Sequence, residues 1–282
     1  MHFLSTLTGC FAQPVDENPT VAMMEAAYAH HGIDARYLNC EVAPAGLAAA
    51  VAGARAMGWV GFNLSIPHKI AVIGHLDRLA PSAEVIGAVN CVARDGDALV
   101  GHNFDGQGFL TSVREVVDPA GARVAVLGAG GAARAIAVEL GLAGAASIDI
   151  VSRRPEPGRA LAEVISARTR AAGRWVPWQG RWTAPGGLDL LVNATQVGLF
   201  PDVDAIPAID LDSLRAPTVV ADVIPNPPTS ALVAAARSRG LVTLDGLGML
   251  VNQGALAVQL WTGVDPDRDV MRARLAAIFA AG

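Results

Sequence analysis

Two residues in the first part of the chain carry the groups that acid–base chemistry needs. Lys69 closes a polar stretch at residues 63–69, and Asp105 lies within a second one at residues 101–109. Both stretches follow expected strands beside Gly or Pro, where an α/β sheet presents side chains to a crevice. An ammonium and a carboxylate that converge there tune each other's pKa and can move the proton of a carbonyl–alcohol interconversion. The alternative is solvation at the surface, the commoner fate of a single Lys or Asp.

A glycine-rich turn between a strand and a helix indicates a dinucleotide site. Residues 124–127 are an unbroken apolar run, typical of a buried parallel strand, and the Ala-rich stretch that follows the glycines favours a helix. Between them, Gly128, Gly130 and Ala133 match the pattern G-x-G-x-x-G/A. The first glycine allows the turn, the second lets a pyrophosphate approach the backbone, and the small third residue lets helix pack on strand. The pyrophosphate would then bind the free N–H groups of the helix N-terminus.

The residues after the next strand indicate which dinucleotide is bound. The run at residues 147–151 ends in Ser152, Arg153 and Arg154. An NAD site usually has an acid about 20 residues after the glycines for the ribose 2′-OH, whereas an NADP site tends to have arginine for the 2′-phosphate. Two arginines and no acid favour NADP, with NAD as the alternative cofactor. Solvated loop charges are the other interpretation of the two arginines.

Length and composition are those of a two-domain α/β protein. The 282 residues suit two domains of ordinary size, and 52% hydrophobic with 17% charged residues is typical of a compact chain with buried strands. A net charge of −5 without a basic cluster argues against nucleic acid or an anionic membrane as partner. No apolar run reaches the ~18 residues of a membrane span, and the N-terminus lacks signal-peptide features.

Cysteine usage indicates the compartment. Cys10, Cys40 and Cys91 are odd in number, widely spaced and in no metal pattern, so we expect free thiols in a reducing environment. We therefore expect a cytoplasmic protein without a metal site. Its partners should be small molecules, and it should be a monomer or a homodimer.

Alternating strands and helices must position the polar groups of the first part. Asn18 or Asp16 is placed to cap the first helix, with Pro19 in its first turn. The alternation predicts an α/β region in its own right. We expect strands at residues 3–8, 37–42 and 59–64, and helices at 21–28 and 45–57.

The part after the arginines continues this alternation. We expect a turn at residues 155–157, and a loop packed on the sheet around Trp175, Trp178 and Trp182. Further strands are expected at residues 188–193, 218–223 and 241–244, and helices at 158–169, 230–239, 249–260 and 267–280.

Several blocks in one order along the chain carry a resemblance to a known family. They are N-L-S-I-P-H-K ending at Lys69, G-A-V-N-C around Asn90, G-H-N-F-D-G-Q-G-F around Asp105, G-A-G-G-A-A from Gly128, N-A-T-Q-V-G from residue 193 and D-G-L-G-M-L-V-N-Q-G-A from residue 245. Ordered blocks are far more specific than any one of them. Over nearly its whole length, the chain resembles the shikimate dehydrogenase family, including its quinate/shikimate branch.

The resemblance implies a fold and an activity. An N-terminal α/β substrate domain, residues 1–106 and 250–282, would join a Rossmann-type NADP-binding domain, residues 107–249, with the active site in the inter-domain cleft. The implied activity is reversible hydride transfer between NADP(H) and a ring carbon of 3-dehydroshikimate/shikimate or a related cyclic polyol, as in aromatic amino acid biosynthesis.

The resemblance also implies roles for individual residues. Lys69 and Asp105 would be the catalytic pair, Asn90 and Gln253 would hold ring hydroxyls, and Ser65 would replace a usual threonine. The remaining residues implied at the substrate are Asp16, Asn18 and Asn63. Those implied at the cofactor are Gly128, Gly130, Gly131, Ala132, Ser152, Arg153, Arg154, Thr195, Val223, Gly246 and Met249, the last few near its nicotinamide end.

The chain departs from the family where the substrate's carboxylate would bind. Shikimate-using members carry Ser-x-Ser and a Tyr there, whereas this chain has Asp16-Glu17-Asn18 and Pro225. An ionised Asp only accepts hydrogen bonds and repels a carboxylate. We therefore expect a different cyclic polyol or ketone, neutral or amine-bearing, read by Asp16 or Asn18. The alternative is that Asp16 turns to solvent while Asn18 and Thr20 still bind a carboxylate.

Two other functions stay open at this point. One is a non-catalytic NAD(P)-binding sensor, although a sensor would not need both Lys69 and Asp105. The other is a quinate-type, NAD-dependent dehydrogenase. A methylene-tetrahydrofolate-type dehydrogenase lacks support from the block around Gln253.

Overall fold

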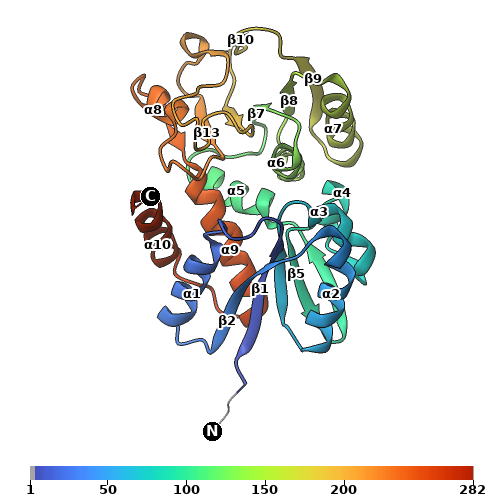
Figure 1. Cartoon of the computed structure of the whole chain (residues 1–282). Helices are drawn as coiled ribbons and strands as arrows, with labels where there is room; N and C mark the ends of the chain where they lie inside the picture. Colours follow the sequence, from blue (N-terminus) through green and yellow to red (C-terminus); the bar gives the residue numbers. More distant parts are fainter. Residues whose placement is uncertain (1–3, 282) are drawn as a thin grey trace. The chain divides into compact units, whose positions relative to one another are not determined.

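The chain divides into two compact units in the computed structural model, which describes residues 4–281. Unit 1 contains the described residues up to Phe104 and those from Gln253 onward, and unit 2 contains Asp105–Asn252 (Figure 1). Two helices contain the points where the chain passes between the units, α5 (Phe104–Arg114) and α9 (Gly246–Thr262). No helix within residues 4–281 is long and apolar enough to cross a membrane.

Unit 1 is built on a six-stranded mixed sheet in the order β2-β1-β3-β5-β6-β4. Strand β1 pairs in parallel with β2 and β3, whereas β5 runs antiparallel to both β3 and β6. Gly96, with a φ of 60°, allows the two-residue connection between β5 and β6. The strands are β1 (Thr6–Ala12), β2 (Ala35–Glu41), β3 (Gly61–Leu64), β4 (Arg78–Leu79), β5 (Cys91–Asp95) and β6 (Ala98–His102).

Helices cover both faces of this sheet (Figure 1). Leu47 and Val51 of α2 pack with Phe11 and Phe62 on one face, and α1 packs against α10 on the other. The helices of unit 1 are α1 (Thr20–His30), α2 (Leu47–Ala56), α3 (His68–Ala71), α4 (Pro81–Ile86) and α10 (Arg268–Ala281), with the 3-10 turns η1 (Pro44–Gly46) and η2 (Val72–His75).

Unit 2 is built on a six-stranded, all-parallel sheet in the order β14-β13-β11-β7-β8-β9. This is the Rossmann order, in which the chain leaves the central strand in opposite directions and opens a crevice at the carboxyl ends of β7 and β11. The strands are β7 (Arg123–Leu127), β8 (Ser147–Ser152), β9 (Ala172–Pro177), β11 (Leu190–Asn193), β13 (Val219–Asp222) and β14 (Thr243–Leu244), and the short strands β10 (Trp182–Thr183) and β12 (Ile209–Asp210) form a separate pair.

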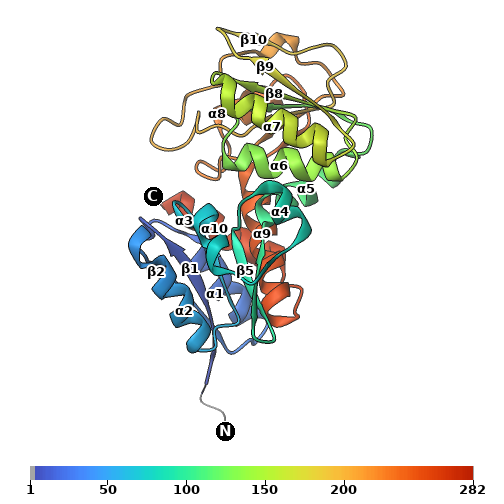
Figure 2. The ribbon, with the colours of Figure 1, turned by 90° about the vertical axis from the view of Figure 1, so that its right-hand side faces the viewer.

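Two layers of helix enclose the parallel sheet of unit 2. Helices α6 (Gly131–Leu142) and α7 (Pro155–Arg168) lie side by side on one face, where Ile136 and Leu161 join the core (Figure 2). Leu232 of α8 (Ala231–Arg237) packs on the other face. The unbroken apolar runs of the sequence therefore predict the buried strands correctly, because both faces of a parallel sheet are covered.

Some boundaries differ from the sequence-based expectation. The first strand covers Thr6–Ala12 in place of residues 3–8, of which Phe3 lies outside the described residues. The expected turn at residues 155–157 is the first turn of α7, because Pro at the start of a helix needs no N–H partner. Trp175 and Trp182 lie on β9 and β10 in place of the expected loop.

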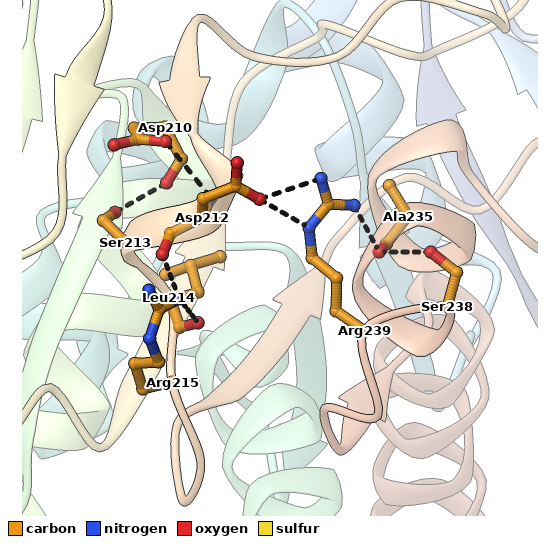
Figure 3. Close-up of polar contacts among 8 residues, drawn as sticks. All are labelled: Asp210, Asp212, Ser213, Leu214, Arg215, Ala235, Ser238 and Arg239. Carbon is orange, nitrogen blue, oxygen red and sulfur yellow. Dashed lines mark hydrogen bonds and ion pairs between the residues drawn. The ribbon is translucent and has the colours of Figure 1, made fainter.

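A surface network fastens the segment after β12 to the end of α8 (Figure 3). Both Nε and Nη2 of Arg239 donate to Asp212 Oδ1, at 3.3 and 3.2 Å, and its Nη1 donates to Ala235 O at 3.1 Å. Asp210 Oδ1 accepts from the backbone N–H of Asp212, which orders the 3-10 turn η3 (Leu211–Ser213). The Arg239–Asp212 pair is exposed, so we assign it a local structural role.

Candidate active site

Three chain segments of unit 1 meet around Asn90. Its Oδ1 accepts from the backbone N–H of Phe104 at 2.7 Å, and its Nδ2 points at Gln253 Oε1 at 3.5 Å. Just before it, the N–H of Val89 donates to the carbonyl oxygen of Lys69 at 2.7 Å. Asn90 and Gln253 are buried. The structure thus brings together three of the expected residues, Lys69, Asn90 and Gln253, within one unit.

A layer of neutral polar groups lies beneath these residues. Asn63 accepts a hydrogen bond from the Tyr37 hydroxyl at 2.8 Å and donates to Asn90 O at 3.0 Å, which fixes the orientation of its amide. Burial raises the pKa of Tyr37, and it raises the pKa of the Cys10 thiol to about 12. These two groups therefore stay protonated at neutral pH and act on the site through hydrogen bonds.

The turn between β3 and α3 carries Ser65 and Lys69. The N–H of Ser65 donates to Phe11 O, and Ser65 O accepts from the N–H of His68 at 2.8 Å. The imidazole of His68 is buried and lies 2.7 Å from Val42 O, so it anchors the turn. Lys69 is half-buried beside this anchor, with the exposed Ile70 next to it.

Asp105 is the second residue of α5 and the first residue of unit 2. It follows Phe104 directly, and the N–H of Phe104 is the one that Asn90 accepts. The hydrogen bond therefore holds the chain one residue before the carboxylate. Within unit 1, the expected substrate residues are linked to the backbone that leads into Asp105.

The segment expected to meet the substrate's acid end is held by Asn18. Asp16 is exposed, and its Oδ1 accepts only from the next N–H in the chain, that of Glu17, at 3.1 Å. Asn18 Nδ2 donates to Asn39 Oδ1, and Asn18 Oδ1 accepts from the N–H of Thr20, each at 3.2 Å. Asn18 thus bonds the first residue of α1, but the expected cap is wrong: the N-cap residue is Pro19, expected inside the first turn, and no side chain caps the helix.

The glycine-rich turn of unit 2 fits a dinucleotide. Gly128 has a φ of +107°, and an added Cβ would lie 3.1 Å from Ala194 O, so glycine is required by conformation and by the close approach of the next loop. At Gly130 and Gly131 an added Cβ would meet no described atom within 4 Å. No described side chain caps α6, so the first N–H groups of this helix, that of Ala132 included, have no capping side chain that competes with a pyrophosphate.

The expected 2′-phosphate residues follow the end of β8. Arg153 and Arg154 are exposed, and Arg154 is the N-cap residue of α7. Ser152 is buried, and its hydroxyl donates to Arg154 O at 3.0 Å and accepts from Trp175 Nε1 at 3.1 Å. The arginines are therefore available to a ligand, whereas the Ser152 hydroxyl bonds within the protein.

The loops at the carboxyl ends of β11 and β13 are joined by a buried network. Asn193 Nδ2 donates to Asp222 Oδ1 at 3.0 Å, and Asn193 Oδ1 accepts from both N–H and Oγ1 of Thr195, at 3.1 and 2.7 Å. The N–H of Val223 donates to Asn193 O at 3.1 Å. The network places Thr195 and Val223 at neighbouring strand ends, and Thr195 lies beside Gly128.

The first turn of α9 joins this group of loops. An added Cβ at Gly246 would lie 2.2 Å from Ile224 O, so only glycine lets the helix start against this strand end. Met249, half-buried, packs against the core on the α6 side of the sheet. The expected cofactor residues of unit 2 thus lie on loops at the carboxyl edge of one sheet and on the first turn of α9.

Some residues that support the site were not predicted from the sequence. Tyr37 and Asn39 both lie on β2 and orient Asn63 and Asn18. Trp175 orients Ser152, and Asp222 orients Asn193. Polar residues at strand positions with buried neighbours were the only sequence signal for them. Among the described residues, no cluster of His, Cys, Asp and Glu is arranged to hold a metal ion.

Comparison with known proteins decides the family. Residues 10–92 match the model of the shikimate dehydrogenase substrate binding domain, and residues 246–276 match that of the shikimate 5′-dehydrogenase C-terminal domain. The chain is 42% identical over 278 residues to the shikimate dehydrogenase (NADP(+)) of Citrifermentans bemidjiense, covering 96% of this chain and 94% of that protein. The chain belongs to the shikimate dehydrogenase family. It is an NAD(P)-dependent oxidoreductase, as the sequence blocks predicted.

Two solved structures of this family bear on the substrate. The ligand-free 5-ketofructose reductase of Gluconobacter sp. strain CHM43 has a TM-score of 0.96 and 55% identity, covering 99% of this chain and 100% of that one. The shikimate 5-dehydrogenase of Listeria monocytogenes, in complex with shikimate and NAD, has a TM-score of 0.90 and 32% identity, covering 96% of each chain. The family therefore includes relatives of this chain that act on different substrates.

Proposed function

We propose that this enzyme interconverts a neutral polyhydroxylated ketone and its alcohol with NADP(H), on a substrate of the 5-ketofructose class. The observation that carries the proposal is Asp16, an exposed carboxylate where shikimate-using members have a hydroxyl. At ~4 Å from a substrate carboxylate, its repulsion would be about 1 kcal/mol in bulk water and about 4 kcal/mol at an effective dielectric of 20. A neutral ketone avoids this penalty and leaves Asp16 as a hydrogen-bond acceptor for a hydroxyl.

The amide of Asn18 supports the same substrate class. Its oxygen accepts from Thr20 and one of its two Nδ2 hydrogens goes to Asn39 Oδ1, so Asn18 keeps a single neutral N–H for a ligand, which suits a hydroxyl. The identity to the 5-ketofructose reductase is 55%, against 42% to the shikimate dehydrogenase of Citrifermentans bemidjiense. 5-Ketofructose carries no acid group, which agrees with the chemistry of the segment.

The second candidate substrate is shikimate itself. The relatives named shikimate dehydrogenase, such as the one at 42% identity, favour it. In that case Asp16 would point to solvent while Asn18 and Thr20 hold the carboxylate. The two candidates differ in the charge of the substrate, which makes them separable by kinetics.

We propose that Lys69 and Asp105 transfer the hydroxyl proton. Lys69 is the only lysine among 21 Lys and Arg residues. Arginine stays protonated in proteins, whereas a lysine amine can release its proton. The reaction requires a group with an exchangeable proton, and Lys69 is the one Lys or Arg side chain that can provide it. NADPH, held by the glycine-rich turn of unit 2, would supply the hydride to the carbonyl carbon when bound. The Lys69/Asp105 pair protonates the carbonyl oxygen, while Asn90 and Gln253 bind neighbouring hydroxyls.

We infer NADP(H) as the preferred cofactor, held by Gly128–Ala132 at the pyrophosphate and by Arg153 and Arg154 at the 2′-phosphate. We also propose a cytoplasmic monomer or homodimer that binds small molecules only. The three described cysteines are free thiols, which supports a reducing compartment.

An NADPH-oxidation assay with product analysis tests this function. With 5-ketofructose as substrate, we expect turnover and a product in which one carbonyl has become CH–OH. The Lys69→Ala variant, prepared identically, controls for contaminating reductases and should lack the activity. Turnover of 3-dehydroshikimate in the ordinary range of enzymes, ~10⁴ M⁻¹s⁻¹ or more, with none of 5-ketofructose, would establish the second candidate instead.

A further inference from the structure

The only donor hydrogen of the Ser152 hydroxyl is engaged within unit 2. It goes to Arg154 O at 3.0 Å, and one of the two lone pairs of the hydroxyl accepts from Trp175 Nε1 at 3.1 Å. The backbone oxygen of Ser152 accepts from the N–H of Trp178 at 3.1 Å. A hydroxyl has only one hydrogen to donate, so Ser152 does not donate to a 2′-phosphate while this arrangement holds. Its function in cofactor binding must be indirect.

The indole of Trp175 is itself clamped by the first turns of α7. An added Cβ at Gly158 would lie 2.4 Å from both Trp175 Cδ1 and Ser152 Oγ, so the helix backbone presses directly on the pair. The guanidinium of Arg159 lies over the indole, 4.6 Å from its centroid. The ring is therefore held from two sides, and its N–H donates to Ser152.

The chain of contacts ends at the two arginines. Ser152 fixes the carbonyl of Arg154, and Arg154 is the N-cap residue of α7 in an extended conformation, with φ −94° and ψ 117°. Both guanidinium groups are exposed, so their backbone is the part that the protein controls. The direction in which Arg153 and Arg154 leave the sheet depends on this turn.

We propose that Trp175, acting through Ser152, is a positioning residue that sets the preference for NADP(H) over NAD(H). It holds the Ser152–Arg154 turn so that the arginines reach the 2′-phosphate, the one group that distinguishes the two cofactors. The inference rests on the proposed function only in assigning Arg153 and Arg154 to that phosphate. It is independent of which ketone is reduced.

The Trp175→Phe variant tests the inference, because it keeps an aromatic ring under Arg159 and removes only the donor N–H. We expect kcat/KM for NADPH to fall about three- to tenfold because KM for NADPH rises. The kcat, and the kcat/KM for NADH, should stay within about twofold of wild type. Trp178→Phe is the matched control, because it removes an indole N–H that donates to Ala208 O, also at 3.1 Å. It should leave the NADPH/NADH ratio unchanged.

A second variant removes the same hydrogen bond from the other side. Ser152→Ala should shift the ratio in the same direction, and it keeps the test valid where Trp175→Phe does not fold. An equal fall for both cofactors, or an unchanged ratio in both variants, would overturn the inference. The double variant Arg153→Ala/Arg154→Ala separates a failure of this inference from a failure of the proposed function. A lowered ratio there upholds the phosphate assignment, whereas an unchanged ratio overturns that assignment and the inference with it.

Discussion

Asn18 and Asn39 are joined by hydrogen bonds in both directions. Asn18 Nδ2 donates to Asn39 Oδ1 at 3.2 Å, and Asn39 Nδ2 donates to Asn18 O at 3.0 Å and to Val15 O at 3.2 Å. Strand β2 therefore holds residues 15–18, the segment proposed to distinguish a neutral substrate from an acid. The selectivity of this segment depends on a residue that does not itself need to touch the ligand.

Asn39→Ala should weaken substrate binding with little effect on the chemical step. It removes hydrogen bonds to Val15 and Asn18, so the segment loses its fixed position. We expect KM for the ketone to rise about tenfold while kcat changes by less than about twofold. Steady-state kinetics at saturating NADPH measures both. Arg36→Ala, an exposed change on the same strand, is the control, and a fall in kcat alone would contradict the positioning role.

Asp16→Ser should raise activity toward an acidic substrate. The change removes a carboxylate and adds a hydroxyl donor, so we expect kcat/KM for shikimate to increase about tenfold or more. Glu17→Ser removes the neighbouring exposed carboxylate and serves as the matched control. Equal effects of the two variants would show that net charge, rather than the position of Asp16, governs selectivity.

Lys69→Arg tests whether the single lysine acts as a proton donor. The variant keeps a positive charge but lacks an amine that can release its proton. We expect kcat to fall by at least ~10² while the affinity for NADPH, measured by fluorescence titration, is retained. Asp105→Asn should have a similar effect on kcat. Full activity of Lys69→Arg would reduce the role of Lys69 to binding by charge.

Asp222→Asn should change how stability depends on pH. Burial raises the pKa of Asp222, although hydrogen bonds from Ser230, Ile224 and Asn193 oppose the shift. The folded chain thus binds this proton more tightly than the unfolded chain. The protonated carboxyl therefore contributes to the free energy of unfolding at pH values below the ordinary pKa of 3.8. This contribution is lost as the pH rises through the raised pKa of the folded chain.

The Asp222→Asn variant cannot ionise at this position, so it does not lose stability in this way as the pH rises. The Tm of Asp222→Asn minus that of wild type should therefore increase from about pH 4 to about pH 7, as scanning calorimetry can show. Asp202→Asn, at an exposed position of the same unit, is the control. A difference that shrinks with rising pH would mean that ionised Asp222 is stabilised in the folded chain.

The sequence predicts the Rossmann unit well because its signals are local. The apolar runs before Gly128 and Ser152 become β7 and β8, and the glycines lie between strand and helix as their spacing requires. Pro155 misled the prediction because proline is favoured both in turns and in the first turn of a helix. The order of the unit 2 strands follows the general rule for such folds.

The residues that support the site could not be predicted from the sequence because their contacts join positions far apart in the chain. Trp175 reaches Ser152 from a neighbouring strand, and Asn39 reaches Asn18 across 21 positions of the chain. A Trp among Gly and Pro residues is typical of a packed loop, and only the pairing of β8 with β9 places it on a strand. The departure at Asp16, in contrast, was visible from the sequence because Asp16-Glu17-Asn18 stands where the family carries Ser-x-Ser before the first helix.

The specificity constant of the wild-type enzyme for shikimate with NADP⁺ tests the central claim most directly. Measured beside that for the 5-ketofructose class on one preparation, it should lie at least ~10²-fold below, because Asp16 opposes the substrate carboxylate. A kcat/KM for shikimate of ~10⁴ M⁻¹s⁻¹ or more, equal to or above the value for the neutral ketone, would contradict the account.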